Sequence, residues 1–461
     1  MVHTFQCLGV NIAVDVNSGA VHVLDELTYH LLEQVQPPMG EHCPAELCAR
    51  LPQYDPAALE ESWQELRGLA AEGLLFEEDD YIDREKAASM QQQALVKALC
   101  LHVSHDCNLR CKYCFASTGD FGQGRKIMPP EIAKKAIDFV IARSGVRHNI
   151  EVDFFGGEPL MAWDTVTQTV DYARSLEEKH NKKFRFTITT NGLLLDEDKR
   201  KYINENMDNC VLSLDGRREV NDEFRKTVAG TGSYDTIVPK FKALVDERDP
   251  NLDYYARGTF TSHNLDFAED VLSIADAGFD RLSVEPVTAD PGCGYDLTED
   301  DLPKIEAEYD RLTDIMLERK KEGKPFTFFH FMVDLDQGPC VVKRLRGCGA
   351  GYEYVAVTPD GDIYPCHQFV GKDEFKQGSV LDQSFNMDIA QKFAGMNIYS
   401  RPKCQKCWAK FYCSGGCSAA NYNMNHDMND SYDLGCEMER KRLECAIYLK
   451  AMDKICANQS K

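Results

Sequence analysis

The sequence predicts an α/β protein whose centre is a partial (β/α)6 barrel. Strand-like and helical segments alternate six times between residues 99 and 284, and strands joined by crossover helices form a parallel sheet. A different order, short β runs and then amphipathic helices, occupies the first 90 residues. Ten of the 19 cysteines follow residue 327. We therefore expect three domains: residues 1–90, 91–327 and 328–461.

Composition sets limits on the function. At 461 residues, 43% hydrophobic and 28% charged, the chain has the composition of a folded protein. A net charge of −23 without a basic stripe argues against nucleic-acid binding and is typical of a solvated acidic surface. The sequence has no signal-peptide pattern and no apolar run long enough for a membrane span. We expect a cytoplasmic protein, in which cysteines serve as metal ligands or buried thiols and not as disulfides.

Residues 1–90 form a winged-helix-like module. The turn Asn17-Ser18-Gly19 joins β-rich runs, and Gly73 introduces a last strand-like run. The charged segment Glu77–Gln93 is typical of a helical connector. The expected strands are His3–Leu8, Ile12–Asp15, Ala20–Val23 and Leu74–Phe76, and the expected helices are Glu26–Gln34, Pro44–Arg50 and Ala57–Ala71.

Residues 91–327 form the predicted barrel. The expected strands are Leu99–Val103, Ile150–Phe155, Phe184–Thr189, Asn209–Leu214, Ala256–Thr261 and Arg281–Val284. The expected helices between them are Glu131–Ser144, Trp163–Lys179, Glu197–Asn206, Tyr234–Glu247 and Phe267–Ala277. Residues 328–461 are rich in turn residues, and we expect helices there only at Asp388–Phe393 and Glu437–Ile455. Such a region buries too little apolar surface to fold alone, so metal sites are expected to stabilise it.

Three cysteines follow the first barrel strand with the spacing Cys-x3-Cys-x2-Cys: Cys107, Cys111 and Cys114. Three thiolates on a four-iron cluster leave one iron open for another ligand. A zinc site is the alternative, but structural zinc prefers four ligands, usually from Cys-x2-Cys pairs. The loop also lies at the carboxyl end of a strand, where α/β folds place their active sites.

This loop, with Tyr113 before its last cysteine, resembles the signature of the radical S-adenosylmethionine (SAM) superfamily. The resemblance implies that the open iron of a [4Fe–4S] cluster chelates SAM, whose cleavage yields a 5′-deoxyadenosyl radical. The segment Gly156-Gly157-Glu158-Pro159 resembles the family's Gly-Gly-Glu-Pro segment, which holds the SAM ammonium group. By the same resemblance, Ser213 and Arg225 are candidates to hold the SAM ribose and carboxylate, and Glu285 is a further candidate. No pattern identifies a catalytic side chain.

The C-terminal cysteines resemble the seven-cysteine SPASM region of radical enzymes that modify peptides and proteins, including Gly361 before Cys366. A zinc ribbon is the alternative, but it would not use seven spaced cysteines. The resemblance implies two further [4Fe–4S] clusters, three in all. Either Cys340 supplies the eighth ligand, or the first auxiliary cluster keeps an open iron that could bind a substrate thiolate. The implied ligands are Cys348, Cys366 and Cys417 for the first auxiliary cluster, and Cys404, Cys407, Cys413 and Cys436 for the second.

The run from Gly349 to Gln368, with the N-terminal module, resembles the SCIFF maturases of Cys-rich ribosomal peptides. That resemblance implies an enzyme that forms thioether crosslinks between a cysteine sulfur and a carbon of a precursor peptide. The N-terminal module would bind the leader as an added strand, and a flavodoxin- or ferredoxin-type protein would supply electrons. A module that only stabilises the enzyme is the simpler reading. An anaerobic sulfatase-maturing enzyme that oxidises Cys or Ser, an iron–sulfur electron carrier and a zinc-bound interaction module remain alternatives.

Overall fold

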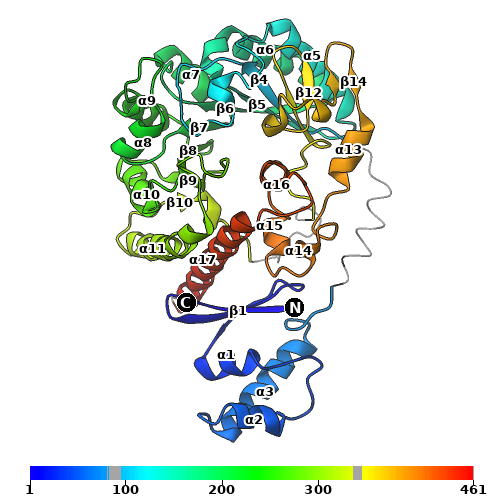
Figure 1. Ribbon diagram of the computed structural model, residues 1–461, viewed down its shortest axis with the longest axis vertical. Helices are drawn as coiled ribbons and strands as arrows, with labels where there is room; N and C mark the ends of the chain where they lie inside the picture. The colour runs from blue at the N-terminus through cyan, green and yellow to red at the C-terminus, as the bar shows by residue number, and fades with distance from the viewer. Residues whose placement is uncertain (80, 82–94, 336–344, 460–461) are drawn as a thin grey trace.

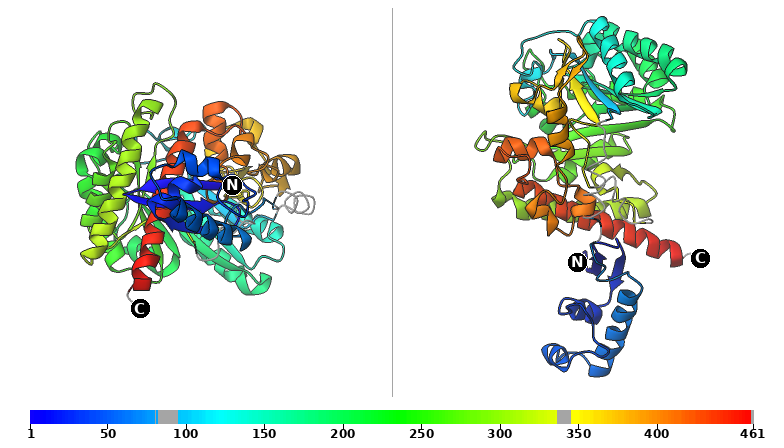
Figure 2. Two further views of the ribbon diagram at one scale, coloured as in Figure 1. Left: turned by 90° about the horizontal axis from the view of Figure 1, so that it is seen from below. Right: turned by 90° about the vertical axis from the view of Figure 1, so that its right-hand side faces the viewer.

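The computed structural model describes residues 1–79, 81, 95–335 and 345–459, and it has three parts along its longest axis (Figure 1). The barrel lies at one end and the N-terminal unit at the other. The C-terminal helix α17 (Asp433–Gln459) crosses between them (Figures 1 and 2). None of the described helices is long and apolar enough to cross a membrane.

The N-terminal unit is a three-stranded antiparallel sheet followed by three helices, with a core that includes Leu31, Leu59 and Trp63. The predicted strand Leu74–Phe76 is wrong: the segment is bent, and the Leu74 carbonyl contacts the ring of His22 on β3 and not the backbone of that strand. Most of the predicted connector lies outside the described residues. The elements are β1 (Val2–Cys7), β2 (Val10–Asp15), β3 (Val21–Leu24), α1 (Glu26–Leu32), α2 (Ala45–Arg50) and α3 (Pro56–Ala71).

The six predicted strands form a parallel sheet in sequence order, which confirms the partial barrel. Alternate residues of β5, β6, β7 and β8 are buried, Phe154 and Phe186 among them, whereas every residue of β4 is buried. The strands are β4 (Ala98–Ser104), β5 (Asn149–Gly156), β6 (Lys183–Thr190), β7 (Asn209–Ser213), β8 (Asp253–Phe260) and β9 (Arg281–Pro286). The helices are α5 (Pro130–Arg143), α6 (Trp163–His180), α7 (Glu197–Asn206), α8 (Arg218–Phe224), α9 (Tyr234–Asp246), α10 (Phe267–Asp276) and α11 (Leu302–Lys321).

The sheet does not stop at the barrel. β10 (Thr327–Phe328) pairs with β9 at one edge, and β11 (Tyr354–Val357) pairs in parallel with β4 at the other. A short antiparallel series continues from β11 through β12 (Asp362–Tyr364), β13 (Gly378–Ser379) and β14 (Ser384–Phe385). The Cys-rich region is therefore continuous with the barrel sheet.

The prediction of only two helices in the Cys-rich region is wrong. Short helices also form between the cysteines, and Pro402 begins the first of them, where its missing N–H costs no hydrogen bond. The helices α14 and α15 have four residues each, which is too few to show a helical period in the sequence. The α-helices before α17 are α13 (Met387–Ala394), α14 (Pro402–Gln405), α15 (Lys410–Cys413) and α16 (Ser418–Asn425), and the 3-10 turns of the chain are Ser117–Gly119, Pro159–Ala162, Glu299–Asp301, Phe329–Phe331, His367–Phe369 and Asp373–Phe375.

Helix α17 joins the three parts. One side of it packs on α11, and its Tyr448 belongs to a buried cluster with Phe5 of β1 and Trp408. His3 of β1 stacks on Trp408 at 4.0 Å between ring centroids and contacts Glu444 of α17 at 2.9 Å. The β1 side of the N-terminal sheet is therefore docked on the Cys-rich region.

Candidate functional site

The carboxyl ends of β4 to β7 meet at one edge of the sheet and enclose a cavity of about 270 Å³. The strand ends place the cluster loop, the Gly156-Gly157 segment, Asn191 and Ser213 around this cavity. All six residues that we predict to contact SAM line it: Tyr113, Gly156, Gly157, Glu158, Ser213 and Arg225.

The cluster loop packs tightly against the Gly156-Gly157 segment. The Glu158 N–H donates to the carbonyl oxygen of Asp106 at 2.9 Å. A Cβ atom at Gly157 would lie 2.2 Å from that same oxygen, so no other residue fits here without moving the loop. Gly119 approaches from the other side, where a Cβ atom would lie 2.6 Å from Cβ of Cys107. Close backbone packing therefore helps to position the first thiol.

Glu158 is buried, and the protein already uses part of its carboxylate. Oε1 accepts from Thr190 Oγ1 at 2.7 Å and from the Leu160 N–H at 3.0 Å, while Oε2 accepts from the Asn191 N–H at 2.8 Å. Burial raises the pKa of Glu158, and these hydrogen bonds oppose the rise. A carboxylate offers about four acceptor positions. One position on Oε2 therefore remains for an ammonium group in the cavity.

Tyr113 and Arg225 form a buried network with Asp215. The Tyr113 hydroxyl donates to Asp215 Oδ2 at 2.5 Å and accepts from Arg225 Nη1 at 2.9 Å. Burial raises the pKa of Asp215 to about 6, with the Arg225 charge opposing it. The Nε–H of Arg225 is buried without a partner in the described part of the chain. Because an unsatisfied buried donor is costly, this N–H fits an anionic ligand such as the SAM carboxylate.

The cluster thiols also fit a metal cofactor. Burial raises the pKa of Cys107 to about 12 and that of Cys111 to about 11. Adjacent thiolates in such a site need a cationic iron centre to offset their charge. The three cysteines lie together at the cavity wall, and their ligation of iron stays a prediction.

The predicted ligands of the first auxiliary cluster also lie together. Cys348, Cys366 and Cys417 line a cavity of about 910 Å³ that Tyr113 and Cys114 also line. Burial raises the pKa of Cys366, and its neighbours Cys417 and Cys348 raise it further. Cys340 lies outside the described residues. The cluster loop and the first auxiliary set therefore face one shared cavity.

The predicted ligands of the second auxiliary cluster form a separate group. Cys404, Cys407, Cys413 and Cys436 line a cavity of about 340 Å³ together with Lys406 and Arg440 and their neighbours. Burial raises the pKa of Cys413 to about 12 and that of Cys436 to about 11. Four thiols around one cavity that basic side chains also line could supply a protein ligand to each of the four irons of a [4Fe–4S] cluster. Their ligation also stays a prediction.

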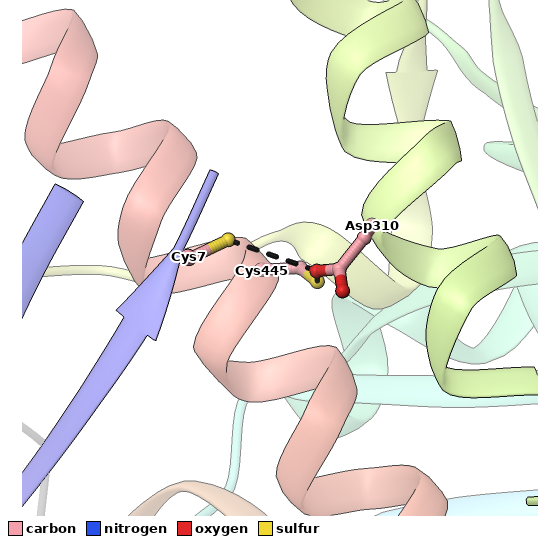
Figure 3. Close-up of side chains that lie close together, drawn as sticks. All are labelled: Cys7, Asp310 and Cys445. Atoms are coloured by element: carbon pink, nitrogen blue, oxygen red, sulfur yellow. Dashed lines mark hydrogen bonds between the residues drawn. The ribbon is translucent and has the colours of Figure 1, made fainter. Parts of the chain in front are cut away.

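The spacing of these thiols differs from that of a single-ion site. Among the described residues, the one group of three Cys, His, Asp or Glu ligand atoms within 4.8 Å of one another is Cys7, Asp310 and Cys445 (Figure 3). There, however, the Lys441 ammonium lies 2.6 Å from Asp310 Oδ1 and already neutralises the carboxylate. No three of the predicted cluster thiols among the described residues lie within 4.8 Å of one another.

Sequence reasoning missed several residues of the site. Asp215 has no local signal, because its hydrogen bond with Tyr113 joins residues 102 positions apart. Asn191 donates from Nδ2 to Cys107 Sγ at 3.6 Å. Arg257 donates to Glu285 Oε2 at 2.5 Å, and both line the cavities. No local signal marks Arg257, because only the barrel places β8 beside β9.

Comparisons with known proteins agree with this geometry. Residues 101–253 match the model of the radical SAM superfamily, and residues 348–408 match SPASM, an iron–sulfur cluster-binding domain. A cysteine-type anaerobic sulfatase-maturating enzyme of Clostridium novyi is 25% identical over 72% of this chain and 90% of its own. The radical SAM cyclopropyl synthase TigE of Paramaledivibacter caminithermalis is 24% identical over 70% of this chain and 68% of its own.

Solved structures show the same fold. Native anSMEcpe with bound AdoMet superposes with a TM-score of 0.63 at 21% identity, covering 79% of this chain and all of that one. Streptococcus suis SuiB bound to precursor peptide SuiA has a TM-score of 0.53 at 17% identity, covering 93% and 97% of the two chains.

The fold, the cluster loop and the matching models define a radical SAM enzyme. More narrowly, the chain belongs to the radical SAM enzymes that carry a SPASM domain. Its cofactors are SAM and [4Fe–4S] clusters.

Proposed function

We propose that this enzyme matures a Cys-rich precursor peptide by forming thioether crosslinks between a cysteine sulfur and a carbon. The observation that carries the proposal is the cavity of about 910 Å³, which the cluster loop and the first auxiliary cysteines line together. A peptide segment in this cavity would lie between a site of hydrogen abstraction and a site for a sulfur. When bound, SAM and the reduced cluster would supply a radical that removes one hydrogen atom from carbon; the cysteine sulfur would lose its proton, and the one electron released as the carbon–sulfur bond forms would pass to the first auxiliary cluster.

The roles of the chain's own residues follow from their contacts. Glu158 Oε2 would accept from the SAM ammonium group, and Arg225 Nε would donate to the SAM carboxylate. Ser213 lines the same cavity and could contact the ribose. Tyr113 and Asp215 orient Arg225. Rigid placement of both reactants in one cavity is what proximity catalysis requires.

The N-terminal unit is proposed to bind the leader of the precursor. The strand order β1-β2-β3 leaves two edges, and β1 is docked on Trp408 and α17. At the β3 edge, the side chain of Val23 is 44% exposed. An extended peptide can pair with such an edge through its backbone. We therefore place the leader on β3.

Proline substitutions can test the β3 edge. Successive N–H groups of an edge strand point alternately toward the neighbouring strand and away from it. Of His22 and Val23, therefore, one has an N–H that points away from β2, and its replacement by Pro removes a donor that only a bound peptide would use. One of the two should weaken leader binding by roughly tenfold while preserving SAM cleavage. The other should also disturb the β2–β3 pair. Unchanged leader affinity in both folded variants would exclude this edge.

A second candidate function is oxidation of a Cys or Ser in a sulfatase, since a relative that aligns with 72% of this chain is named a cysteine-type anaerobic sulfatase-maturating enzyme. Reduced enzyme should be given SAM and either a Cys-rich precursor or a sulfatase peptide, and the products analysed by tandem mass spectrometry. We expect precursor molecules that have lost two hydrogens per crosslink and fragment as rings. Formylglycine in the sulfatase peptide, with unmodified precursor, would favour the alternative. A protein that releases no 5′-deoxyadenosine would be a carrier or scaffold.

A further inference from the structure

Arg401 is a buried cation beside both auxiliary cysteine groups. Arg401 is the residue before α14, the helix that contains Cys404, and it is 3% exposed. Nη1 donates to the carbonyl oxygen of Gly415 at 2.5 Å, and Nη2 donates to Ser418 Oγ at 2.9 Å. Both partners are next to predicted ligands, since Gly415 lies between Cys413 and Cys417. The guanidinium is thus held against the peptide segment that links the two groups.

This cation has no carboxylate partner among the described residues. Its two acceptors are neutral, and its buried Nε–H has no acceptor in that part of the chain. Burying a charge without an opposite charge costs several kcal/mol, by the general estimate for buried ions. A side chain that carries such a cost is expected to face an anion.

Two other buried cations make the contrast clear. Lys410, also 3% exposed, lies 2.6 Å from Asp79 Oδ2 and is neutralised by it. Arg248 has no carboxylate contact of this kind, but its Nε, Nη1 and Nη2 all donate to oxygen atoms of the protein. Unlike Lys410, Arg401 has no carboxylate partner among the described residues. Unlike Arg248, it has one N–H without an acceptor in that part of the chain.

The charges that interact with Arg401 are those of cysteines from both predicted auxiliary ligand sets. Burial lowers the pKa of Arg401, and four thiols oppose that effect: Cys404 and Cys413 from the second set, and Cys417 and Cys348 from the first. A [4Fe–4S] cluster with thiolate ligands carries net negative charge and accepts hydrogen bonds at its sulfurs, and both features set its reduction potential. The donor set and the charge of Arg401 therefore suit two anionic clusters.

We propose that Arg401 is the positive charge shared by the two auxiliary clusters, and that it raises the reduction potential of both. It is a positioning residue, which contacts neither SAM nor the substrate. This inference rests on the proposed ligand sets, which iron analysis tests separately.

The test uses the full-length chain with Cys107, Cys111 and Cys114 replaced by Ala, so that only the auxiliary clusters contribute. Arg401→Gln and Arg401→Lys are added to this background, and redox titrations are followed by electron paramagnetic resonance. Arg401→Gln should move both midpoint potentials to more negative values with about eight irons per chain retained. Arg401→Lys, which keeps the charge, should restore most of the shift. Lys410→Gln is the matched control and should change the potentials less, because Asp79 already screens that charge.

Unchanged potentials in Arg401→Gln with full iron content would overturn the proposal. If Arg401→Gln loses iron, the Arg401→Lys variant distinguishes two explanations. Clusters retained in Arg401→Lys would support a need for the positive charge. Clusters lost in Arg401→Lys would show that the shape of the guanidinium group is required instead, which would overturn the proposal. A parent protein without about eight irons would refute the ligand sets and not the role of Arg401.

Discussion

The SAM cradle, which consists of the Cys107–Cys114 loop with Gly156, Gly157 and Glu158, and the auxiliary-cysteine region, residues 348–436, both group thiols that we predict to bind iron. The two regions position these thiols differently. In the cradle, the thiols follow β4 and lie against the ends of β5 to β7, over a core in which Leu101, Phe154 and Ile188 are fully buried. In the auxiliary region, Cys404 and Cys413 lie on helices of four residues each. We infer that the barrel holds its cluster loop in place before iron binds, whereas the short helices between the auxiliary cysteines depend on iron.

The largest expected effect is on the cradle. Replacing Cys107, Cys111 and Cys114 together with Ala should lower the iron content by about four per chain and abolish SAM cleavage. The auxiliary clusters and the protease resistance of the whole chain should persist, because strands position this loop. The measurements are iron analysis and chromatography of 5′-deoxyadenosine. Persistent cleavage would refute the assignment of the loop.

The corresponding change in the auxiliary region should affect folding. Replacing Cys404 and Cys407 with Ala should also remove about four irons. Here we expect rapid proteolysis within residues 398–436, since α14 and α15 are too short to persist alone. Limited proteolysis with peptide mapping measures this. Equal protease resistance in the two cysteine variants would remove the contrast between the regions.

Gly157 tests whether backbone packing holds the cradle. Gly157→Ala places a Cβ atom 2.2 Å from the Asp106 carbonyl oxygen, so the cluster loop must move. We expect SAM cleavage to fall at least about a hundredfold, because small displacements of reacting groups are costly. Gly122→Ala is the control, since its added Cβ meets nothing within 4 Å and only its positive φ of 69° is strained. Similar losses in both variants would indicate general strain.

The smallest expected effect is a pH dependence inside the barrel. Burial raises the pKa of Asp153 on β5 to about 7. The pKa of Asp153 in the folded state is therefore higher than the unfolded value of about 3.9, and between about pH 4 and pH 7 the folded state binds more protons than the unfolded state. The free energy of unfolding therefore falls as the pH rises toward about 7. Asp153→Asn should remove about 1–2 kcal/mol of that decline, reduced by partial solvent exposure. Anaerobic urea unfolding at pH 5.5 and pH 8 measures it.

Asp198→Asn on the exposed side of α7 is the control for Asp153→Asn. It should leave the pH dependence of the wild type in place. If the unfolding free energy of Asp153→Asn fell between pH 5.5 and pH 8 as much as that of the wild type, the pH dependence would come from other groups.

Local patterns predicted much of the molecule. Each of the six barrel strands and five helices forms within a few residues of its expected bounds, because hydrophobic periodicity reports burial directly. The cluster cysteines and the two glycines beside them are short-range motifs. The short helices around Cys404, Cys413 and Cys417 were missed, since so few residues carry no periodic signal.

The sequence by itself therefore determined the partial barrel, the three thiols at the end of β4 and the grouping of seven later cysteines. Only the tertiary structure decided which distant groups meet: Asp215 with Tyr113, β11 with β4, and Arg401 with both cysteine sets. The physical reason is that motifs and strand patterns depend on neighbours in sequence. A buried charge and its partner are brought together by packing, and segments as far apart as Ala98 and Tyr354 carry no local record of that contact.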